Sequence, residues 1–263
     1  MKGMYVMSIE KVIVKMSKAI RPFFFNSFPK SGTHLMFQIL TGIHSITFDQ
    51  NLHLYEGVSA QLADHQRELE KLKENEFLSG HIYYSASWEK LLQDLDLKQV
   101  FLYRDLRDVV VSYNYYIEKV DAPLHQYYQK KQLSKKERML SIIRGIPELG
   151  HQNIHDWFSE FKGWLTALNV LSVKFEDLLR SEDSLDQSVQ KIVQFITEEE
   201  LGNLDQTIIK RAKENISTQD SATFRKGTIG NWKEEFDEEI SDAFKEIAGH
   251  LLIELGYEKD LLW

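Results

Sequence analysis

Cysteine is absent from the 263 residues, and no apolar run is long enough to span a bilayer. Without cysteine the chain can form neither disulfides nor thiol catalysts, which favours a reducing compartment. Positive charge is in the minority, with 32 lysines and arginines against 40 aspartates and glutamates and a formal net charge of −8. Such a surface repels nucleic acid and anionic membranes. We therefore expect a cytoplasmic protein with no nucleic-acid partner and no integral membrane association, in which any anion site is built locally.

Proline and glycine are also scarce, at 4 and 13 residues, and the chain has no repeats or low-complexity linkers. A hydrophobic share of 43% and a charged share of 27% are typical of globular proteins. We expect one domain over residues 1–263. Within residues 1–20, apolar residues at helical spacing predict an amphipathic helix laid on this domain, with a targeting or membrane-surface helix as the alternative.

Short apolar runs alternate with helical patterns along the chain. Strands are expected over Pro22–Asn26, Phe77–Gly80, Gln99–Tyr103 and Val170–Phe175. Helices are expected over His34–Thr41, Ser87–Leu92, Asp105–Ile117, a broad region Lys135–Leu168, Ser184–Ile196 and Asp237–Leu255. This alternation predicts an α/β fold with a mostly parallel central sheet flanked by helices. Ligands of such sheets bind at the carboxyl ends of the strands.

Three stretches carry residues suited to anions. In FFFNSFPKSGTHLM, residues 23–36, a strand meets a helix whose first amides and dipole favour an anion, and Lys30 adds positive charge. The stretch lacks the first glycine of G-x-x-x-x-G-K-[ST], so it is not that nucleotide triphosphate loop. The alternative is an ordinary strand-to-helix turn, in which proline, serine and glycine are common.

The second stretch is YRDLRDVVVSY, residues 103–113. Arg104 follows a predicted strand directly, as Lys30 does, so the two can converge on one crevice, and its guanidinium suits a phosphate. Ser112 adds a neutral hydroxyl donor on the following helix. We interpret Asp105, Arg107 and Asp108 as solvated surface pairs.

The third stretch is FRKGTIGNWKEEF, residues 224–236. Arg225 and Lys226 precede Gly227, which would let backbone amides approach a phosphate closely. By itself, a basic loop of this kind is usually solvated surface.

Taken in order, PKSGT, YRDLRDVVVSY and RKGTIGNWK resemble the cytosolic sulfotransferase family, from about Phe23 onward, and we expect a bacterial-type member. The resemblance implies the sulfotransferase fold with a P-loop-like phosphosulfate-binding loop. It also implies in-line transfer of a sulfuryl group from 3′-phosphoadenosine 5′-phosphosulfate (PAPS) to a hydroxyl or amine acceptor. The product would be 3′-phosphoadenosine 5′-phosphate (PAP), and no metal is needed.

The resemblance also implies roles for individual residues. The 5′-phosphosulfate would be held by Lys30, Ser31, Gly32, Thr33 and His34. The 3′-phosphate would be held by Arg104, Ser112, Arg225, Lys226 and Gly227. Lys30 would stabilise the leaving 5′-phosphate, with Ser112 modulating it. Leu35 and Phe175 stand where the family usually has tryptophan and tyrosine, so the adenine pocket would be looser or differently lined. His34 replaces a usual threonine, and it adds either a charge or only a backbone contact.

His81, in FLSGHIYYS, occupies the place of the family's catalytic histidine and is expected to be the general base. Ser79 stands where the family commonly has lysine. A capping or core histidine is the alternative for His81, and Glu56 is the alternative base. His151 and His155 are four apart, but no ligand cluster surrounds them, so we expect core or surface histidines and no metal site.

The sequence does not distinguish between small molecules, lipids and glycans as the acceptor. Aromatic residues between 113 and 168 could line its pocket, although the helical spacing of Trp157, Phe161 and Trp164 favours core packing. We expect a substrate lid in a loop over Asp121–Lys131. The stretch Lys233–Asp242 has acids in place of the family's usual dimer motif, so we expect a monomer or a dimer of another kind.

Two other functions share parts of this pattern. A P-loop-type kinase or NTPase would use the same strand–loop–helix anion site and would bind magnesium-ATP. A non-catalytic nucleotide-binding module would keep Lys30, Arg104 and Arg225 but would have no use for His81.

Overall fold

A computed structural model of the chain describes residues 19–43, 45–55, 62–120, 123–199, 206–217 and 228–263. The helix expected within residues 1–20 lies outside these ranges, apart from residues 19 and 20. Within the described ranges, no helix combines the length and the apolar character needed to cross a bilayer.

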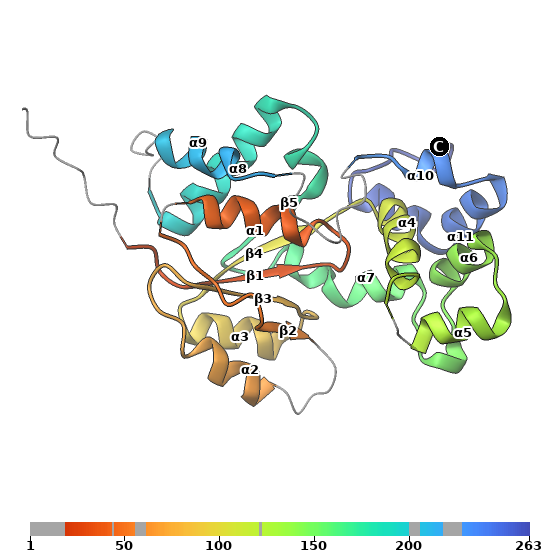
Figure 1. Cartoon of the computed structure of the whole chain (residues 1–263), viewed down its shortest axis with the longest axis horizontal. Coiled ribbons are helices and arrows are strands. Elements are labelled where there is room, and N and C mark those ends of the chain that lie inside the picture. Colours follow the sequence, from red (N-terminus) through yellow and green to blue (C-terminus); the bar gives the residue numbers. More distant parts are fainter. Residues whose placement is uncertain (1–18, 44, 56–61, 121–122, 200–205, 218–227) are drawn as a thin grey trace, which may run out of the picture.

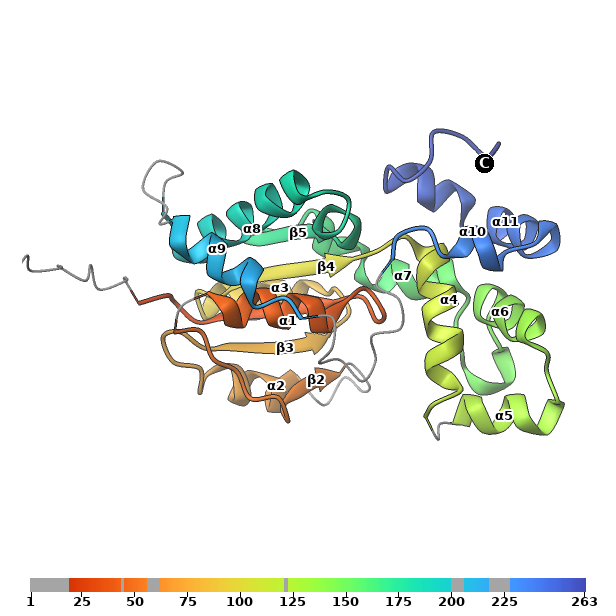
Figure 2. The same cartoon turned by 45° about the horizontal axis from the view of Figure 1, so that its top comes forward.

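A central sheet of five parallel strands has the order β2-β3-β1-β4-β5 (Figures 1 and 2). The strands are β1 (Phe23–Ser27), β2 (His53–Tyr55), β3 (Phe77–His81), β4 (Lys98–Tyr103) and β5 (Val170–Lys174). The parallel α/β sheet and four of its strands are therefore confirmed, with ends that differ by one residue. The edge strand β2 was not predicted, because three residues are too few to show an alternating pattern.

The central strand β1 is buried over its whole length. Phe24 stacks on Trp88 of α3 (Ala86–Asp94), with ring centroids 5.9 Å apart. Phe23 and Phe25 point to the opposite face and pack in a second cluster with α1 (Thr33–Gly42). A strand covered on both faces reads as an unbroken apolar run, which explains the three consecutive phenylalanines.

Helices cover both faces of the sheet, as predicted (Figure 1). On one face lie α1, α8 (Glu182–Thr197) and α9 (Gln206–Glu214), and on the other lie α2 (Leu62–Leu69) and α3. Beyond the carboxyl ends of the strands lies a group of further helices (Figure 2). This group contains α4 (Leu106–Ile117), α5 (Pro123–Lys131), α6 (Lys135–Arg144), α7 (Ile154–Lys162), α10 (Trp232–Glu235) and α11 (Glu238–Glu254).

Two helical expectations need correction. The broad region Lys135–Leu168 is divided into α6, η2 (Pro147–Leu149), α7 and η3 (Gly163–Leu165). The break falls at Gly145 and Gly150, whose φ angles of 78° and 67° glycine adopts without strain. The stretch expected as a lid loop forms helix α5 over most of its length. Helices α2, α9 and α10 were not predicted.

Asn26 joins the ends of β1 and β3 beside His81. Its side chain is fully buried, its Nδ2 donates to the Ile82 carbonyl at 3.0 Å, and its Oδ1 accepts from the Ile82 amide at 2.9 Å. The same carbonyl accepts from Trp164 Nε1 at 2.9 Å. The amide side chain thus continues the strand pairing by one step and fixes the backbone that follows His81.

Replacing Asn26 with alanine should leave the buried Ile82 amide without an acceptor. We expect a loss of about 2–4 kcal/mol in the free energy of unfolding, because two buried hydrogen bonds are removed together. Urea denaturation of Asn26→Ala measures this loss, and Asn51→Ala, at an exposed position, serves as the control with a change within about 0.5 kcal/mol. Equal stabilities of the two variants would contradict the structural role assigned to Asn26.

Candidate active site

A cavity of about 530 Å³ opens at the carboxyl edge of the sheet. The residues assigned to the donor site or to catalysis from the sequence that border it are Lys30, Gly32, Thr33, His34, Leu35, His81, Arg104, Ser112 and Phe175. Ser31 is buried, and its Oγ has no hydrogen-bond partner within the described part of the chain. Arg225, Lys226, Gly227 and Glu56 lie outside the described residues. The structure therefore brings the first two stretches into one cavity.

The turn between β1 and α1 is shaped as an anion cradle. Lys30 and Gly32 both have left-handed backbones, with φ angles of 68° and 98°. The first helical bond runs from the Met36 amide to the Gly32 carbonyl at 3.2 Å, so the preceding amides have no acceptor within the helix. Successive amides in such a turn form a concavity that binds anions. A Cβ on Gly32 would lie 2.4 Å from the Phe175 ring, so this position requires glycine for space as well as conformation.

Lys30 reaches from this cradle over the ring of Tyr116. Its Nζ lies 3.8 Å from the ring centroid. Burial, together with the neighbouring charges of Lys119 and Arg104, lowers the pKa of Lys30 to about 8. The side chain is therefore mostly protonated at neutral pH, and a nearby anion would stabilise its charged form.

His34 and Leu35 follow in the first turn of α1. Burial and the nearby charge of Lys30 lower the pKa of His34 below its usual value, so at neutral pH this ring adds no charge to the cradle. Leu35 is mostly buried, and both it and Phe175 border the cavity as apolar side chains.

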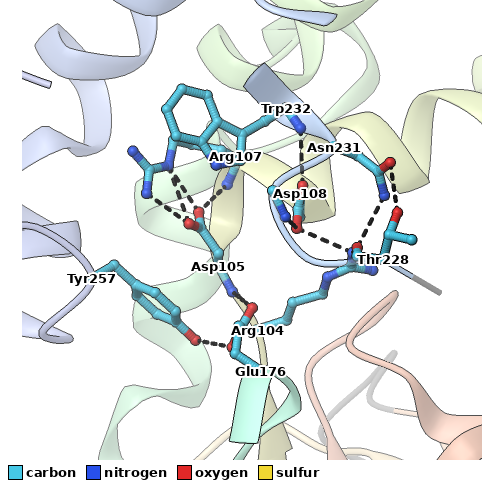
Figure 3. Close-up of polar contacts among 10 residues, drawn as sticks. Arg104, Asp105, Arg107, Asp108, Glu176, Thr228, Asn231, Trp232 and Tyr257 are labelled. Carbon is cyan, nitrogen blue, oxygen red and sulfur yellow. Dashed lines mark hydrogen bonds and ion pairs between the residues drawn. The ribbon is translucent and has the colours of Figure 1, made fainter. Parts of the chain in front are cut away.

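Arg104 lies at the end of β4 with 7% of its surface exposed. Its Nη2 donates to Asp108 Oδ2 at 3.1 Å and to the Thr228 carbonyl at 2.9 Å (Figure 3). Its guanidinium carbon lies 4.3 Å from the centroid of the Phe175 ring. The Nε is buried without a hydrogen-bond partner among the described residues. Arg104 is thus fixed through one nitrogen while other donors remain for a ligand in the cavity.

His81 presents a basic nitrogen to the cavity. Its Nδ1 lies 2.7 Å from the Ser27 carbonyl, which can only accept a hydrogen bond, so Nδ1 carries the proton. In the neutral ring, Nε2 then carries the lone pair. Burial and, to a smaller extent, the charge of Lys30 lower the pKa of His81 to about 4, against the raising effect of its hydrogen bond to Ser27. The ring is therefore neutral at neutral pH, which is the state a general base requires.

His53 is a second histidine at this place that sequence reasoning missed. Its Nδ1 lies 2.8 Å from Ser79 Oγ, and its ring centroid is 4.6 Å from that of His81. Burial, then the charges of His81 and His34, lower the pKa of His53 to about 3. The missing signal was strand β2, since only its pairing with β3 places His53 beside Ser79.

Aromatic rings also line the cavity. They belong to Tyr55, Tyr83, Tyr113, Tyr116, Trp157 and Phe161. Phe161 and Trp164 are fully buried, as expected for core residues, whereas Trp157 is half-buried and borders the cavity.

The expectation of solvated surface pairs in the second stretch is wrong. Asp105, Arg107 and Asp108 expose only 6%, 3% and 1% of their surfaces. Arg107 donates to both oxygens of Asp105 and to Glu258 Oε1, at 2.6 Å for the latter, and lies 3.9 Å from the Trp232 ring centroid. The sequence did hold a signal for this burial. Apolar residues surround the first turns of α4 on nearly every side, which is typical of a buried helix.

Among the described residues, no three or more histidine, aspartate or glutamate side chains are grouped so as to hold a metal ion. The groups that the cavity offers to a ligand are a cradle of backbone amides with a lysine, a restrained arginine, an unprotonated imidazole nitrogen and a wall of aromatic rings.

Comparisons with known proteins give the family of the chain. The profile described as "Sulfotransferase domain" matches residues 21–256. The 3-alpha-hydroxysteroid sulfotransferase of Cavia porcellus is 26% identical over an alignment of 169 residues that covers 57% of this chain and 54% of that protein. The flavonol 3-sulfotransferase of Flaveria bidentis is 25% identical over 226 residues, 71% of this chain and 66% of that protein. The chain thus spans between about half and two thirds of the length of these relatives.

Solved structures show the same fold. Mouse sulfotransferase SULT7A1, solved in complex with PAP, superposes with a TM-score of 0.65 at 17% identity, covering 88% of this chain and 84% of that one. Retinol dehydratase, solved with androsterone and the inactive cofactor PAP, gives a TM-score of 0.58 at 17% identity, with coverages of 88% and 80%. On the strength of the matched domain and the shared fold, the chain belongs to the sulfotransferase family.

Proposed function

We propose that this protein transfers the sulfuryl group of PAPS to a hydroxyl or amine of a small-molecule acceptor. The observation that carries the proposal is the meeting of three groups in one cavity: the cradle at Lys30, the restrained Arg104 and the unprotonated Nε2 of His81. A donor with phosphates at two separate positions needs two cationic sites, and this cavity is bordered by Lys30 in the turn after β1 and by Arg104 directly after β4.

The donor side is argued from the groups that remain available. Ser31, Gly32, Thr33 and His34 contribute the turn and helix start that would hold the 5′-phosphosulfate. Arg104 and Ser112, joined by Arg225, Lys226 and Gly227, would hold the 3′-phosphate. Leu35 and Phe175 would provide an apolar contact for adenine. The buried Ser31 Oγ and Arg104 Nε are polar atoms for which the described chain offers no partner, which supports a polar ligand here.

The protonation states of His81 and Lys30 give each of them a role in the transfer. His81 Nε2 accepts the proton of the acceptor hydroxyl as that oxygen forms its bond to sulfur. The bond between sulfur and the 5′-phosphate oxygen breaks, and that oxygen keeps the electron pair. Lys30 and the amides of α1 stabilise the resulting charge, with Ser112 modulating the lysine. Transfer of this kind is dominated by positioning and charge stabilisation, as in phosphoryl transfer.

The acceptor side favours an apolar or aromatic molecule. Rings of Tyr83, Tyr113, Tyr116 and Trp157 line the same cavity as His81. Two of the matched relatives are named for steroids and flavonols, which are compatible with such a wall. An acceptor screen with labelled PAPS tests the proposal, and a P-loop-type NTPase would instead be stabilised by magnesium-ATP and not by PAP in a thermal-shift assay.

The acidic residues within Lys233–Asp242 support the proposal that the protein does not dimerise through the family's usual motif. Asp237 accepts from the Ile240 amide at 3.0 Å and so caps α11. It also pairs with Lys136 at 2.8 Å, and Glu239 pairs with the same lysine at 2.5 Å. Two of these acids therefore serve the chain's own fold, which is consistent with a monomer or another kind of dimer.

Arg104→Ala should weaken PAP binding and spare adenosine 5′-phosphate (AMP), which lacks the 3′-phosphate. Removing a charge-assisted contact costs about 1.5–3 kcal/mol, which is about ten- to a hundredfold in the dissociation constant. Isothermal titration calorimetry with both ligands measures this, and Arg180→Ala, whose side chain is exposed, is the control. An equal loss of affinity for the two ligands would show that Arg104 does not bind the 3′-phosphate.

PAP affinity should decline as the pH rises through about 8. Lys30 must be protonated to attract phosphate, and its lowered pKa means that the free protein loses this charge in that range. The phosphates of PAP are already ionised above neutrality, since their last pKa is about 6. The dissociation constant measured from pH 7 to 9.5 should rise in the native protein and stay level in Lys30→Arg, whose guanidinium does not titrate there. A level profile in the native protein would argue against a phosphate contact by Lys30.

His81→Ala should lower turnover by about 10²–10⁴-fold, the usual contribution of general-base catalysis. PAP affinity should barely change, because His81 faces the acceptor side of the sulfuryl group. Single-turnover kinetics beside the PAP dissociation constant separate the two effects, and His155→Ala at an exposed position should retain native turnover. Native turnover in His81→Ala would remove this residue from the mechanism, and lost PAP binding would make it a structural residue.

A further inference from the structure

The side chain of Asp108 links the second stretch, residues 103–113, to the described part of the third stretch, residues 228–236. Its side chain is fully buried on α4 and accepts three hydrogen bonds (Figure 3). Oδ2 accepts from Arg104 Nη2 at 3.1 Å and from the Gly230 amide at 2.8 Å. Oδ1 accepts from the Trp232 amide at 3.0 Å. One carboxylate therefore binds the arginine and the backbone segment 228–232 together.

The segment 228–232 is itself braced toward Arg104. The Thr228 carbonyl accepts from Arg104 Nη2 at 2.9 Å and from Asn231 Nδ2 at 3.0 Å. The Thr228 hydroxyl and Asn231 Oδ1 lie 2.8 Å apart. A displacement of this segment would break the Thr228 contact to Arg104, and loss of Asp108 would release both the arginine and the segment.

A carboxylate beside a phosphate site has an electrostatic cost. Two negative charges repel each other, and burial strengthens that repulsion because little water screens it. A side chain whose only effect was its charge would thus weaken phosphate binding. The three hydrogen bonds give the opposite contribution, since they fix a flexible arginine and two backbone amides in advance of binding.

We propose that Asp108 is a positioning residue that sets the preference of this site for a nucleotide with a 3′-phosphate. It acts through Arg104 and through the segment 228–232, which directly follows Arg225–Gly227 in the chain. This inference rests on the proposed donor site and names a residue that shapes the site through the hydrogen bonds that it makes to Arg104 and to the segment 228–232.

Asp108→Asn distinguishes the electrostatic effect from the positioning effect, because the two change PAP affinity in opposite directions. The substitution keeps the size of the side chain but replaces one oxygen with an NH₂ group, which must face a donor from Arg104, Gly230 or Trp232. The negative charge is removed at the same time. If charge dominates, PAP binds more tightly, and if positioning dominates, PAP binds more weakly while AMP is much less affected.

Asp105→Asn is the matched control. Asp105 is a buried acid at the start of the same helix, and it pairs with the other arginine, Arg107, at 2.7 Å. Both substitutions remove a buried charge next to an arginine, so both should lower stability. Only Asp108→Asn should lower the PAP-to-AMP affinity ratio, by about tenfold, since a charge-assisted contact is misplaced in that variant.

The experiment measures PAP and AMP dissociation constants at one fixed salt concentration for the native protein, Arg104→Ala, Asp108→Asn and Asp105→Asn. A reduced ratio in Arg104→Ala and Asp108→Asn, with a native ratio in Asp105→Asn, supports the proposal. A native or raised ratio in Asp108→Asn beside a reduced one in Arg104→Ala overturns the role of Asp108 and leaves the donor site standing. A native protein that does not prefer PAP overturns both, and a reduced ratio in Asp105→Asn overturns the specific role of Asp108.

A milder variant covers the case in which Asp108→Asn does not fold. Asn231→Ala removes the two side-chain bonds to Thr228, at a half-buried position that borders the cavity. The PAP-to-AMP ratio should fall by about threefold, because these two modest hydrogen bonds act on Arg104 only through the Thr228 carbonyl. A native ratio in a folded Asn231→Ala protein overturns the coupling between this segment and the 3′-phosphate site.

Discussion

Arg104, Asp105, Arg107 and Asp108 bring four charges into the interior within five residues, where β4 ends and α4 begins. An ion pair at such a depth adds little net stability, but removing one partner leaves an uncompensated charge and costs several kcal/mol. Each arginine must therefore keep its acidic partner, and the remaining lone pairs of the two carboxylates must find donors. Asp105 accepts from the Arg107 amide at 2.9 Å, and Asp108 takes the amides of the segment after Thr228.

This requirement ties the end of the chain to the sheet. Glu258 and the rings of Trp232 and Trp263 enclose Arg107, and Tyr257 donates to Glu176 Oε2 at 2.9 Å. Glu176 Oε1 in turn accepts from the Asp105 amide at 3.0 Å. Since Glu176 follows Phe175, the same network holds the ring that fills the space over Gly32. The geometry of the cradle thus depends on residues more than 200 positions further along the chain.

The cavity combines restrained cations with rings kept neutral. Burial lowers the pKa values of Lys30, His53 and His81 alike, but the consequences differ. Lys30 starts from a high value and keeps its charge near neutrality, while both histidines lose theirs. The result is a site with positive charge where phosphates would lie and an unprotonated nitrogen where an acceptor would approach. Neutral imidazoles beside Lys30 also avoid adding repulsion that would lower its pKa further.

The sequence predicted the part of this molecule that is made from local signals. Strands β1, β3, β4 and β5 are apolar runs that end in polar turns, and the cradle is a glycine turn at a helix start. Strand β2 was missed because it is recognisable only through its pairing with β3, and the partners of Asp105 and Asp108 were missed because most of them lie far away in the chain, although the apolar residues around the start of α4 indicated that these acids are buried. The same division applies to function. The proposed donor side lies at the ends of β1 and β4, where the motifs fall at strand ends that the sequence predicts. The proposed acceptor side draws on β2, α4 and α7, whose side chains meet only through tertiary packing, so the sequence gives their composition and the fold gives their arrangement.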